Sequence, residues 1–370
     1  MDCASWWRGI RVQIHACVRN KEKRVLACAV ALALSAAITA WLASSLAPFR
    51  LLDRPNERSL HERPVPRGGG LGIVAGGGMA WAVAAAAGGM PPTLAWAGGV
   101  ALVVAAVSFV DDVRGLSALV RFAMQGGAAA VLVWQGLWPE RPPLPGVGWA
   151  WPAALGAVFA WLFIVWMTNL YNFMDGMDGF AGGMAVYGFG ALAVLGWLGG
   201  DQRFALLCGS VAAAAAGFLV FNFPPARIFM GDVGSSALGF LAAAMILWAD
   251  RQGLFPLWIG VLVFSPFVVD ATVTLLRRLL RGETPWRAHR SHCYQLLARS
   301  GWGHRKTVLW EYALMLACAA SAVLAAKAGP AVQWMFILAW AGTYVAILLA
   351  VERIAPFGPS RRSSMEGSGT

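Results

Sequence analysis

The chain has 370 residues, of which 59% are hydrophobic and only 13% charged, and its formal net charge is +11. This composition excludes an ordinary soluble globular domain, in which about a quarter of the residues are charged, and it predicts a polytopic membrane protein. The basic residues stand mainly in short connections between apolar runs, so we expect them to orient the chain in the membrane and expect no nucleic-acid partner. Six scattered cysteines without a C-x-x-C pair predict neither a disulfide framework nor a zinc site.

The apolar runs predict an all-α membrane protein with about eleven transmembrane helices. In chain order, the predicted segments are residues 25–49, 71–89, 92–110, 118–138, 150–170, 180–198, 203–221, 235–249, 254–276, 308–327 and 330–351. We therefore divide the chain into a basic N-terminal segment (1–24), a single transmembrane domain (25–351) and a disordered, polar C-terminal tail (352–370).

The orientation follows from counting Lys and Arg in the connections after residue 24. One side carries 18 of them, and the other side carries only Arg141, Arg203, Arg251 and Lys327. Basic connections stay in the cytoplasm, so the first side is predicted to be cytoplasmic. An odd number of helices then places the basic residues 1–24 outside, against the same rule. Either the first helix is miscounted or translation starts downstream of Met1, and the sequence leaves both open.

Four polar clusters fall on the predicted cytoplasmic side. They contain, in chain order, Asp111 and Asp112, then Asn172, Asp175 and Asp178, then Asn222 and Asp232, and finally His289 and His292. Each cluster alone could cap helix ends, but a random set of caps would appear on both faces of the membrane. Ionisable residues at membrane depth are costly and usually mark function. We therefore interpret the clusters as parts of one site.

The residue types indicate phosphate chemistry. The acids bring together more negative charge than a compact site tolerates without a cation, and their hard oxygen ligands suit Mg²⁺ or Mn²⁺. Arg and His side chains on the same face suit anionic phosphates. The alternative function is a secondary transporter or ion channel with intramembrane carboxylates. That class predicts charges near the bilayer midplane and broken helices in paired halves, whereas these acids crowd one face.

Five motifs resemble a known family in sequence and in order. They are residues 53–70, Asp111-Asp112 with Leu116-Ser117, Asn-Phe-Met-Asp-Gly-Met-Asp-Gly (172–179), Phe-Met-Gly-Asp-Val-Gly-Ser (229–235) and His-Arg-Ser-His-Cys-Tyr-Gln (289–295). Over roughly residues 50–305 the chain resembles the polyprenyl-phosphate N-acetylhexosamine-1-phosphate transferases. That superfamily includes bacterial initiators of O-antigen synthesis and the phospho-MurNAc-pentapeptide translocase.

The resemblance implies an enzyme of the bacterial inner membrane with a cytoplasmic site. Such an enzyme moves a sugar 1-phosphate from a UDP-sugar to undecaprenyl phosphate, releases UMP and requires Mg²⁺. For the acids, the resemblance implies that Asp232 is a metal ligand, beside which we count Asn172, and that Asp111 and Asp112 lie at the catalytic centre. It implies that Asp175 and Asp178 line the nucleotide pocket, and we count all four of these aspartates as catalytic candidates. For the other positions, it implies substrate contacts by Asn172, Asn222, Arg121, His289 and His292. Arg121 would hold the carrier phosphate, and the two histidines would touch the diphosphate of the sugar nucleotide.

Some assignments stay open, and some residues are given no role in the site. The string His-Arg-Ser-His replaces the three consecutive histidines of the translocase, which resembles the O-antigen branch and argues against a MurNAc-pentapeptide substrate. We expect an N-acetylhexosamine or its 6-deoxy relative as the sugar, and a product that initiates O-antigen (lipopolysaccharide) or a related surface polysaccharide. The oligomeric state is not fixed, and a homodimer is compatible with the sequence. His61 is left between substrate contact and a surface role. Four arginines near the start of the chain are interpreted only as topology determinants or lipid contacts, namely Arg54, Arg58, Arg63 and Arg67. His304 is interpreted as a residue without a role in the site.

Overall fold

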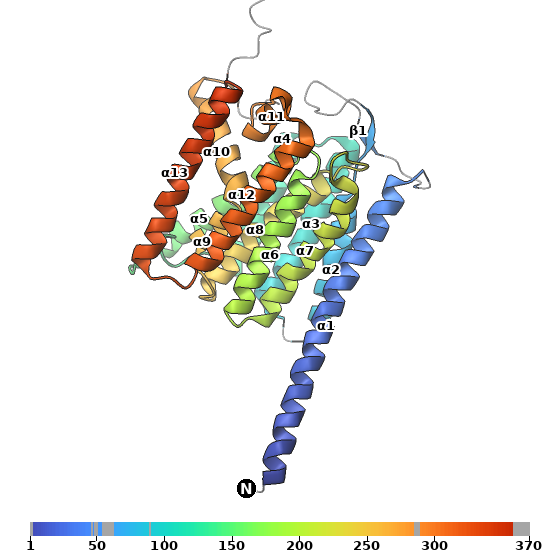
Figure 1. Cartoon of the computed structure of the whole chain (residues 1–370), viewed down its shortest axis with the longest axis vertical. Helices are drawn as coiled ribbons and strands as arrows, with labels where there is room; N and C mark the ends of the chain where they lie inside the picture. The colour runs from blue at the N-terminus through green and yellow to red at the C-terminus, as the bar shows by residue number, and fades with distance from the viewer. Residues whose placement is uncertain are drawn as a thin grey trace, which may run out of the picture.

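The computed structural model describes residues 3–45, 47, 51–53, 63–88, 90–284 and 289–357, with the backbone alone for 3–21. The described residues form a bundle of helices with one short β-hairpin-like pair (Figure 1). The long helices are α1 (Cys3–Ala43), α2 (Gly70–Ala86), α3 (Pro92–Arg114), α4 (Ala118–Trp134), α5 (Ala153–Phe173), α6 (Phe180–Leu198), α7 (Gln202–Asn222), α8 (Asp232–Arg251), α10 (Ser265–Leu280), α12 (Gly303–Ala325) and α13 (Pro330–Ile354). The short elements are β1 (Leu52–Asp53), β2 (Val65–Pro66), α9 (Leu257–Val263), α11 (Cys293–Leu297) and a π-helical turn (Ala298–Trp302).

The helices have the length and composition of membrane spans. Within the described part, eight are long and apolar enough to cross a bilayer, and the bent pair α9–α10 forms up to one more. The shorter apolar helices α2 and α4 complete the set of predicted segments. Large apolar side chains stay exposed on the outside of the bundle, for example Leu324 at 70% and Leu338 at 66%. These features confirm the prediction of an all-α polytopic membrane protein, because such a surface needs hydrocarbon around it.

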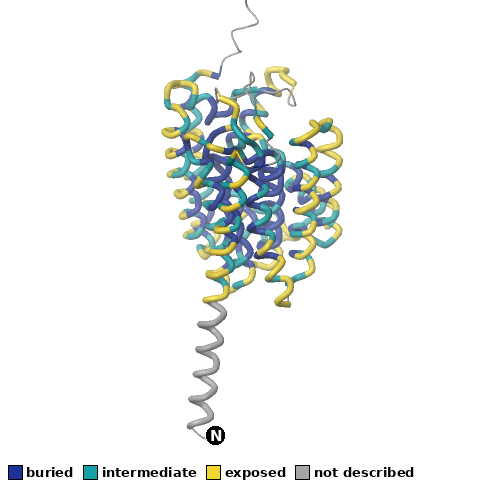
Figure 2. The backbone as a smooth tube through the Cα atoms, turned by 90° about the vertical axis from the view of Figure 1, so that its right-hand side faces the viewer, coloured by how far each residue is buried: buried dark blue, intermediate teal, exposed yellow. Residues whose placement is uncertain are grey.

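Helix α8 forms the centre of the bundle. In its most apolar window 89% of the residues are buried, against 11% in α13, which lies at the periphery. Figure 2 shows the buried residues concentrated in the middle of the bundle and the exposed ones around its rim. A Cβ on Gly239 of α8 would lie 2.5 Å from the carbonyl oxygen of Met167, so only glycine allows α5 to pack this closely. The first residue of α8, Asp232, is consequently held by the best-packed element of the fold.

The predicted segment 254–276 is two helices instead of one. Helices α9 and α10 meet at Phe264 with a bend of 83°. Pro266 stands in the first turn of α10, and because proline has no N–H it cannot continue the hydrogen-bond ladder of the preceding helix. The bend turns α10 toward the end of the bundle where α11 lies (Figure 1).

Both chain ends extend the helices beyond the predicted boundaries. The backbone of α1 is helical from Cys3, although the membrane-spanning part covers Glu22–Ala43. The N-terminal end of α1 lies at the opposite end of the molecule from β1 and α11 (Figure 1). At the other terminus α13 continues to Ile354, and residues 358–370 of the predicted tail lie outside the described residues.

Candidate active site

Two aspartates from different helices are joined by one arginine at the β1–α11 end of the bundle. Asp112 lies in the last turn of α3, and Asp232 is the first residue of α8. The Nη2 atom of Arg67 lies 2.5 Å from Asp112 Oδ1 and 2.7 Å from Asp232 Oδ1. The Asp112 side chain is fully buried, whereas the Asp232 side chain keeps 20% of its surface exposed. With Arg67 in this position, Asp232 is therefore the more accessible carboxylate of the pair.

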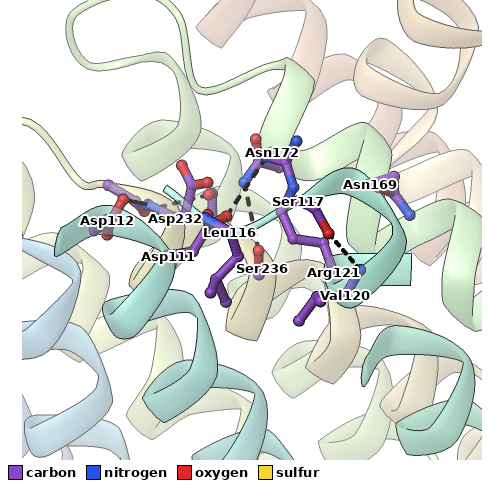
Figure 3. Close-up of polar contacts among 12 residues, drawn as sticks. Asp111, Asp112, Leu116, Ser117, Val120, Arg121, Asn169, Asn172, Asp232 and Ser236 are labelled. Carbon is purple, nitrogen blue, oxygen red and sulfur yellow. Dashed lines mark hydrogen bonds and ion pairs between the residues drawn. The ribbon is translucent and has the colours of Figure 1, made fainter. Parts of the chain in front are cut away.

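The start of α8 fixes the Asp112 carboxylate. Its oxygens accept hydrogen bonds from the backbone N–H of Asp232 at 3.1 Å and of Val233 at 3.2 Å. These first-turn donors have no acceptor inside their own helix, and the positive end of the helix dipole favours a carboxylate at this place. Figure 3 shows Asp112 and Asp232 side by side. The end of α3 and the start of α8 are thus joined through one side chain.

Asp175 is the third carboxylate of this group. It lies in the turn between α5 and α6, and the backbone N–H of Gly231 donates a hydrogen bond to it. The pKa of Asp175 is raised to about 7, mainly by burial and also by the negative charges of Asp232 and Asp112, while Arg67 and the Gly231 hydrogen bond oppose the shift. The like charges are close enough to perturb one another, so we call Asp112, Asp175 and Asp232 the carboxylate cluster.

Glycines bring the Arg67 segment against the start of α8. The N–H groups of Gly68 and Gly69 both donate to the carbonyl of Phe229, at 3.1 and 2.9 Å. A Cβ on Gly70 would lie 2.4 Å from the Cα of Gly234, so a side chain there would push the two segments apart. Gly231 has φ 78°, and a Cβ on it would lie 2.8 Å from Asp112 Oδ2. The glycine triplet 68–70 therefore serves backbone packing.

Asp111 points away from the carboxylate cluster, although it is adjacent to Asp112. Its Oδ1 accepts the N–H of Leu116 at 2.6 Å, and its Oδ2 lies 3.5 Å from Nη1 of Arg121. Gly115 ends α3 in the left-handed region with φ 68°, and Ser117 caps α4 by accepting the N–H of Val120 at 3.4 Å. The Arg121 side chain stays 46% exposed. The two neighbouring aspartates thus organise two different parts of the same end of the bundle.

The two asparagines at the end of α5 also separate. Asn172 Nδ2 lies 3.4 Å from the hydroxyl of Ser236, which stands one turn after Asp232 on α8 (Figure 3). Asn169 donates to Gln125 Oε1 at 2.5 Å and to the carbonyl of Val165 at 2.8 Å. Asn172 is therefore held beside the carboxylate cluster by a long, weak contact, whereas Asn169 binds α4 to α5.

Asp178 and Asn222 fasten loops. Asp178 Oδ2 accepts the N–H of Ala226 at 3.0 Å, and its Oδ1 lies 3.1 Å from Nδ1 of His304. Asn222 accepts the N–H of Gly179 at 2.9 Å and donates to the carbonyl of Ile228 at 2.9 Å, and it is buried. Together these two side chains tie the turn before α6 to the loop between α7 and α8. That loop leads into α8 at Asp232, so both side chains fix the segment that precedes this residue.

The histidine motif is held by Asp270 of α10. One Asp270 oxygen accepts the N–H of Cys293 at 2.9 Å and lies 3.3 Å from Nδ1 of His292, and the other accepts the N–H of Tyr294 at 3.2 Å. The Tyr294 hydroxyl in turn donates to the carbonyl of Phe173 at 3.2 Å. Helix α11 is therefore attached both to α10 and to the turn that carries Asp175.

His289 is the more accessible histidine of the motif. Its ring lies 4.8 Å from that of His292, and its Nδ1 lies 2.9 Å from the hydroxyl of Ser291. Burial lowers the pKa of His289 to about 3, with repulsion from His292 and Arg278 acting in the same direction and Asp270 opposing it. At neutral pH this ring can therefore donate or accept a hydrogen bond but carries no charge.

Comparison with known proteins identifies the family. The model of "Glycosyl transferase family 4" matches residues 94–250, which run from α3 to α8. A probable undecaprenyl-phosphate N-acetylglucosaminyl 1-phosphate transferase of Bacillus subtilis is 33% identical, over 74% of this chain and 76% of that protein. The chain belongs to the polyprenyl-phosphate N-acetylhexosamine-1-phosphate transferase family. Two more relatives of this transferase are a decaprenyl-phosphate N-acetylglucosaminephosphotransferase of Mycolicibacterium smegmatis (32%, covering 74% and 75%) and an undecaprenyl-phosphate alpha-N-acetylglucosaminyl 1-phosphate transferase of Escherichia coli (28%, covering 78% and 79%).

Sequence reasoning missed three polar residues of this transferase site. Arg67 had been interpreted as a topology determinant, yet it bridges two carboxylates. Its place directly before the glycine triplet was the available signal. Asp270 is buried and stands inside the apolar run 254–276, where an acid should have been read as functional. His304 contacts Asp178 although it had been interpreted as bland. His61 lies outside the described residues, so its role stays a prediction.

The transferase family implies Mg²⁺, and the chemistry of the donors fits it. Mg²⁺ is commonly held by one or two carboxylates together with substrate phosphates and water. In the described part of the chain no group of three or more His, Cys, Asp or Glu side chains is arranged to hold an ion. Asp232 and Asp112 would therefore hold it jointly with phosphate oxygens. The amide of Asn172 contacts Ser236, and its predicted metal contact remains a prediction.

Proposed function

We propose that this protein transfers N-acetylglucosamine 1-phosphate from UDP-N-acetylglucosamine to a polyprenyl phosphate, with undecaprenyl phosphate as the expected carrier. The products are UMP and a lipid-linked diphosphate sugar. The observation that supports this proposal most strongly is the carboxylate cluster with Arg67 at one end of a membrane bundle. Its three aspartates all lie in the part of the chain that matches the family model. The sugar is supported by the printed names of the relatives, all of which contain N-acetylglucosamine.

The proposed reaction forms one P–O bond and breaks another. A phosphate oxygen of the carrier attacks the phosphorus that bears the sugar, and the bridging oxygen leaves with UMP. A Mg²⁺ ion held by Asp112 and Asp232 would neutralise the diphosphate and the charge that develops on the leaving group. Asp175 lies beside these residues, so a cation held there would also stabilise its charged form.

Each of the remaining side chains is proposed to bind one of the two substrates or to position a residue that does. Arg121 is half exposed and lies at the start of α4, where it can bind the carrier phosphate while Asp111 orients it. Neutral His289 can donate a hydrogen bond to the diphosphate without adding charge. Asn172 is held beside Asp232 across the α5–α8 contact and offers an amide to the nucleotide. Asp178 and Asn222 act as positioning residues through the loop that leads to Asp232.

The site end of the bundle is proposed to face the cytoplasm of a bacterial inner membrane. The basic residues of the connections support this orientation, since Arg277, Arg278, Arg305 and Lys306 lie near the site end and the connections at the opposite end carry only four. The basic segment 1–24 is the exception, because the start of α1 lies at that opposite end (Figure 1). UDP-sugars are cytoplasmic substrates, so the orientation and the reaction agree. A lipid-linked product formed there would start a surface polysaccharide, of which O-antigen is one.

The test is a release assay on the purified protein in detergent. The protein receives Mg²⁺, undecaprenyl or decaprenyl phosphate, and one UDP-sugar from a panel of N-acetylglucosamine, N-acetylgalactosamine, a 6-deoxy N-acetylhexosamine and MurNAc-pentapeptide. We expect UMP and a lipid-linked sugar with UDP-N-acetylglucosamine, dependent on the carrier. Omission of the carrier and addition of EDTA serve as controls. If monodisperse protein releases no UMP from any donor, the proposed function is wrong; turnover of another donor alone would correct the sugar.

A further inference from the structure

We propose that Arg67 is the resident counter-ion of the carboxylate cluster and that a divalent cation must displace its guanidinium to bind. The guanidinium contacts Oδ1 of Asp112 and Oδ1 of Asp232 and so lies between the two carboxylates. An ion held jointly by these two residues would therefore compete with Arg67 for them. The identity of the cation as the cofactor rests on the proposed function, but the competition itself does not.

The surroundings of Arg67 explain why a cation is needed there. Its guanidinium is stabilised by the charges of Asp232 and Asp112 at contact distance and of Asp53 and Asp175 further away. Without it, the buried Asp112 would stand against Asp232 and Asp175 with only backbone N–H groups as partners. Such like charges destabilise one another in a partly buried site. One monovalent arginine neutralises only part of this charge, so a divalent ion has an electrostatic advantage over it.

The backbone of Arg67 is fixed while its side chain can move. Its N–H donates to the carbonyl of Leu51 at 2.7 Å, and the residue forms a parallel bridge with Phe229. The side chain is 31% exposed and crosses Gly231, where a Cβ would lie 3.2 Å from Arg67 Cγ. Because Gly231 has no Cβ beside Arg67 Cγ, a rotation of the long side chain away from the carboxylates would need no backbone change. The displaced guanidinium would remain tethered beside the metal, in reach of an anionic ligand.

The first experiment measures Mn²⁺ affinity without substrates. Purified protein in detergent is titrated with Mn²⁺, and free Mn²⁺ is followed by electron paramagnetic resonance. We expect Arg67→Gln to bind Mn²⁺ roughly ten- to a hundredfold more tightly than the wild type, because a competing charge about 3 Å from the oxygens is removed. Arg67→Lys keeps the positive charge and should fall between them. Arg227→Gln is the matched control, since Arg227 is exposed on the same loop as Phe229, and it should leave the affinity unchanged.

The second experiment uses the unaltered protein and therefore does not depend on a folded variant. Arginines are labelled with phenylglyoxal, and the extent at each site is read by mass spectrometry. We expect labelling of Arg67 to rise several-fold when Mn²⁺ is added, with Arg227 unchanged as the internal reference. Unchanged or lower labelling of Arg67, or equal Mn²⁺ affinity in the wild type and Arg67→Gln, would overturn the proposal. Neither readout involves UMP release, so failure of the proposed function leaves this result interpretable.

Discussion

Two polar regions at the same end of the bundle use their charge in different ways. Asp178 and Asn222 direct their side-chain atoms to backbone groups and to His304, at distances of 2.9 to 3.1 Å. In the carboxylate cluster, Asp112 and Asp232 share one guanidinium. The first region holds loops together because its hydrogen-bonding capacity is spent inside the protein. The second keeps excess negative charge, which is what a cation or a phosphate-bound metal needs.

The largest expected effect comes from Asp232→Asn. The amide keeps an oxygen that can accept from Arg67 but loses the charge, so we expect UMP release to fall by at least about a thousandfold, since metal charge stabilisation contributes several kcal/mol. Repulsion with Asp112 and Asp175 is also relieved, so the thermal unfolding midpoint should stay or rise. The measurements are UMP release and a thermal melt in detergent. Near-normal turnover would remove Asp232 from the reactive region.

For Asn222→Ala, in the region where Asp178 and Asn222 hold two loops together, we expect a loss of stability that is larger than the direct loss of activity. The change leaves the buried N–H of Gly179 and the carbonyl of Ile228 without their partner, at a cost of about 1–3 kcal/mol for each group. The unfolding midpoint should drop clearly, and activity should fall only as far as the fold loosens.

Asn172→Ala is the matched control for this comparison. Its side chain makes one long contact of 3.4 Å with Ser236, so removal should change the midpoint little and the KM for the UDP-sugar more. If Asn222→Ala lowered kcat at an unchanged midpoint, Asn222 would belong with the reactive residues and the comparison would fail.

A third change tests the contact of Tyr294, from the histidine motif, with the turn that carries Asp175. A Cβ on Gly176 would lie 2.3 Å from the Tyr294 hydroxyl but 3.4 Å from its Cζ. We expect Gly176→Ala to cost about 1–3 kcal/mol through overpacking and to lower activity by moving α11. Tyr294→Phe alone loses the hydrogen bond to Phe173, yet it should partly rescue Gly176→Ala by removing the colliding oxygen.

Gly190→Ala provides the control for the glycine change. Nothing lies within 4 Å of a Cβ at this position in α6, so alanine should stabilise the helix by about 0.5–1 kcal/mol. The double variant Gly176→Ala/Tyr294→Phe could also be no more stable and no more active than Gly176→Ala alone. That result would show that the contact with the Tyr294 hydroxyl does not set the position of α11.

Much of the fold was predictable because a membrane imposes simple constraints on sequence. Long apolar runs must be helical to satisfy their backbone groups, and the predicted segments correspond to the described helices with shifted ends. The bend at Phe264 was not predicted, because a hydropathy window averages over the proline that interrupts the ladder. Helix α11 was also not predicted, since its five residues are held by Asp270 from a distant helix.

Which residues lie in the site was more predictable from sequence than what each of them contacts there. Residue types and shared topology brought Asp111, Asp112, Asp175 and Asp232 to one end. Sequence spacing could not show that Asp111 and Asp112 face different partners, since that depends on the turn at Gly115 and on the start of α8. Arg67 was misassigned because its role comes from backbone contacts with Phe229, a residue far away in sequence.

The smallest expected effect concerns the charge of His289. The pKa of His289 is about 3 in the fold because of burial and of repulsion from His292 and Arg278, with Asp270 opposing, against about 6.5 in an unfolded chain. Between these values the unfolded chain binds a proton that the folded protein does not, so stability is complete above pH 6.5 and falls as the pH is lowered. We expect the unfolding midpoint to drop from pH 7.5 to pH 5.0 by about one or two degrees more in the wild type than in His289→Gln. The carboxylates titrate in both proteins, so only the difference between the two drops reports on His289. Equal drops would mean that the folded protein binds this proton as readily as the unfolded chain does, and the interpretation of His289 as a neutral donor would lose its support.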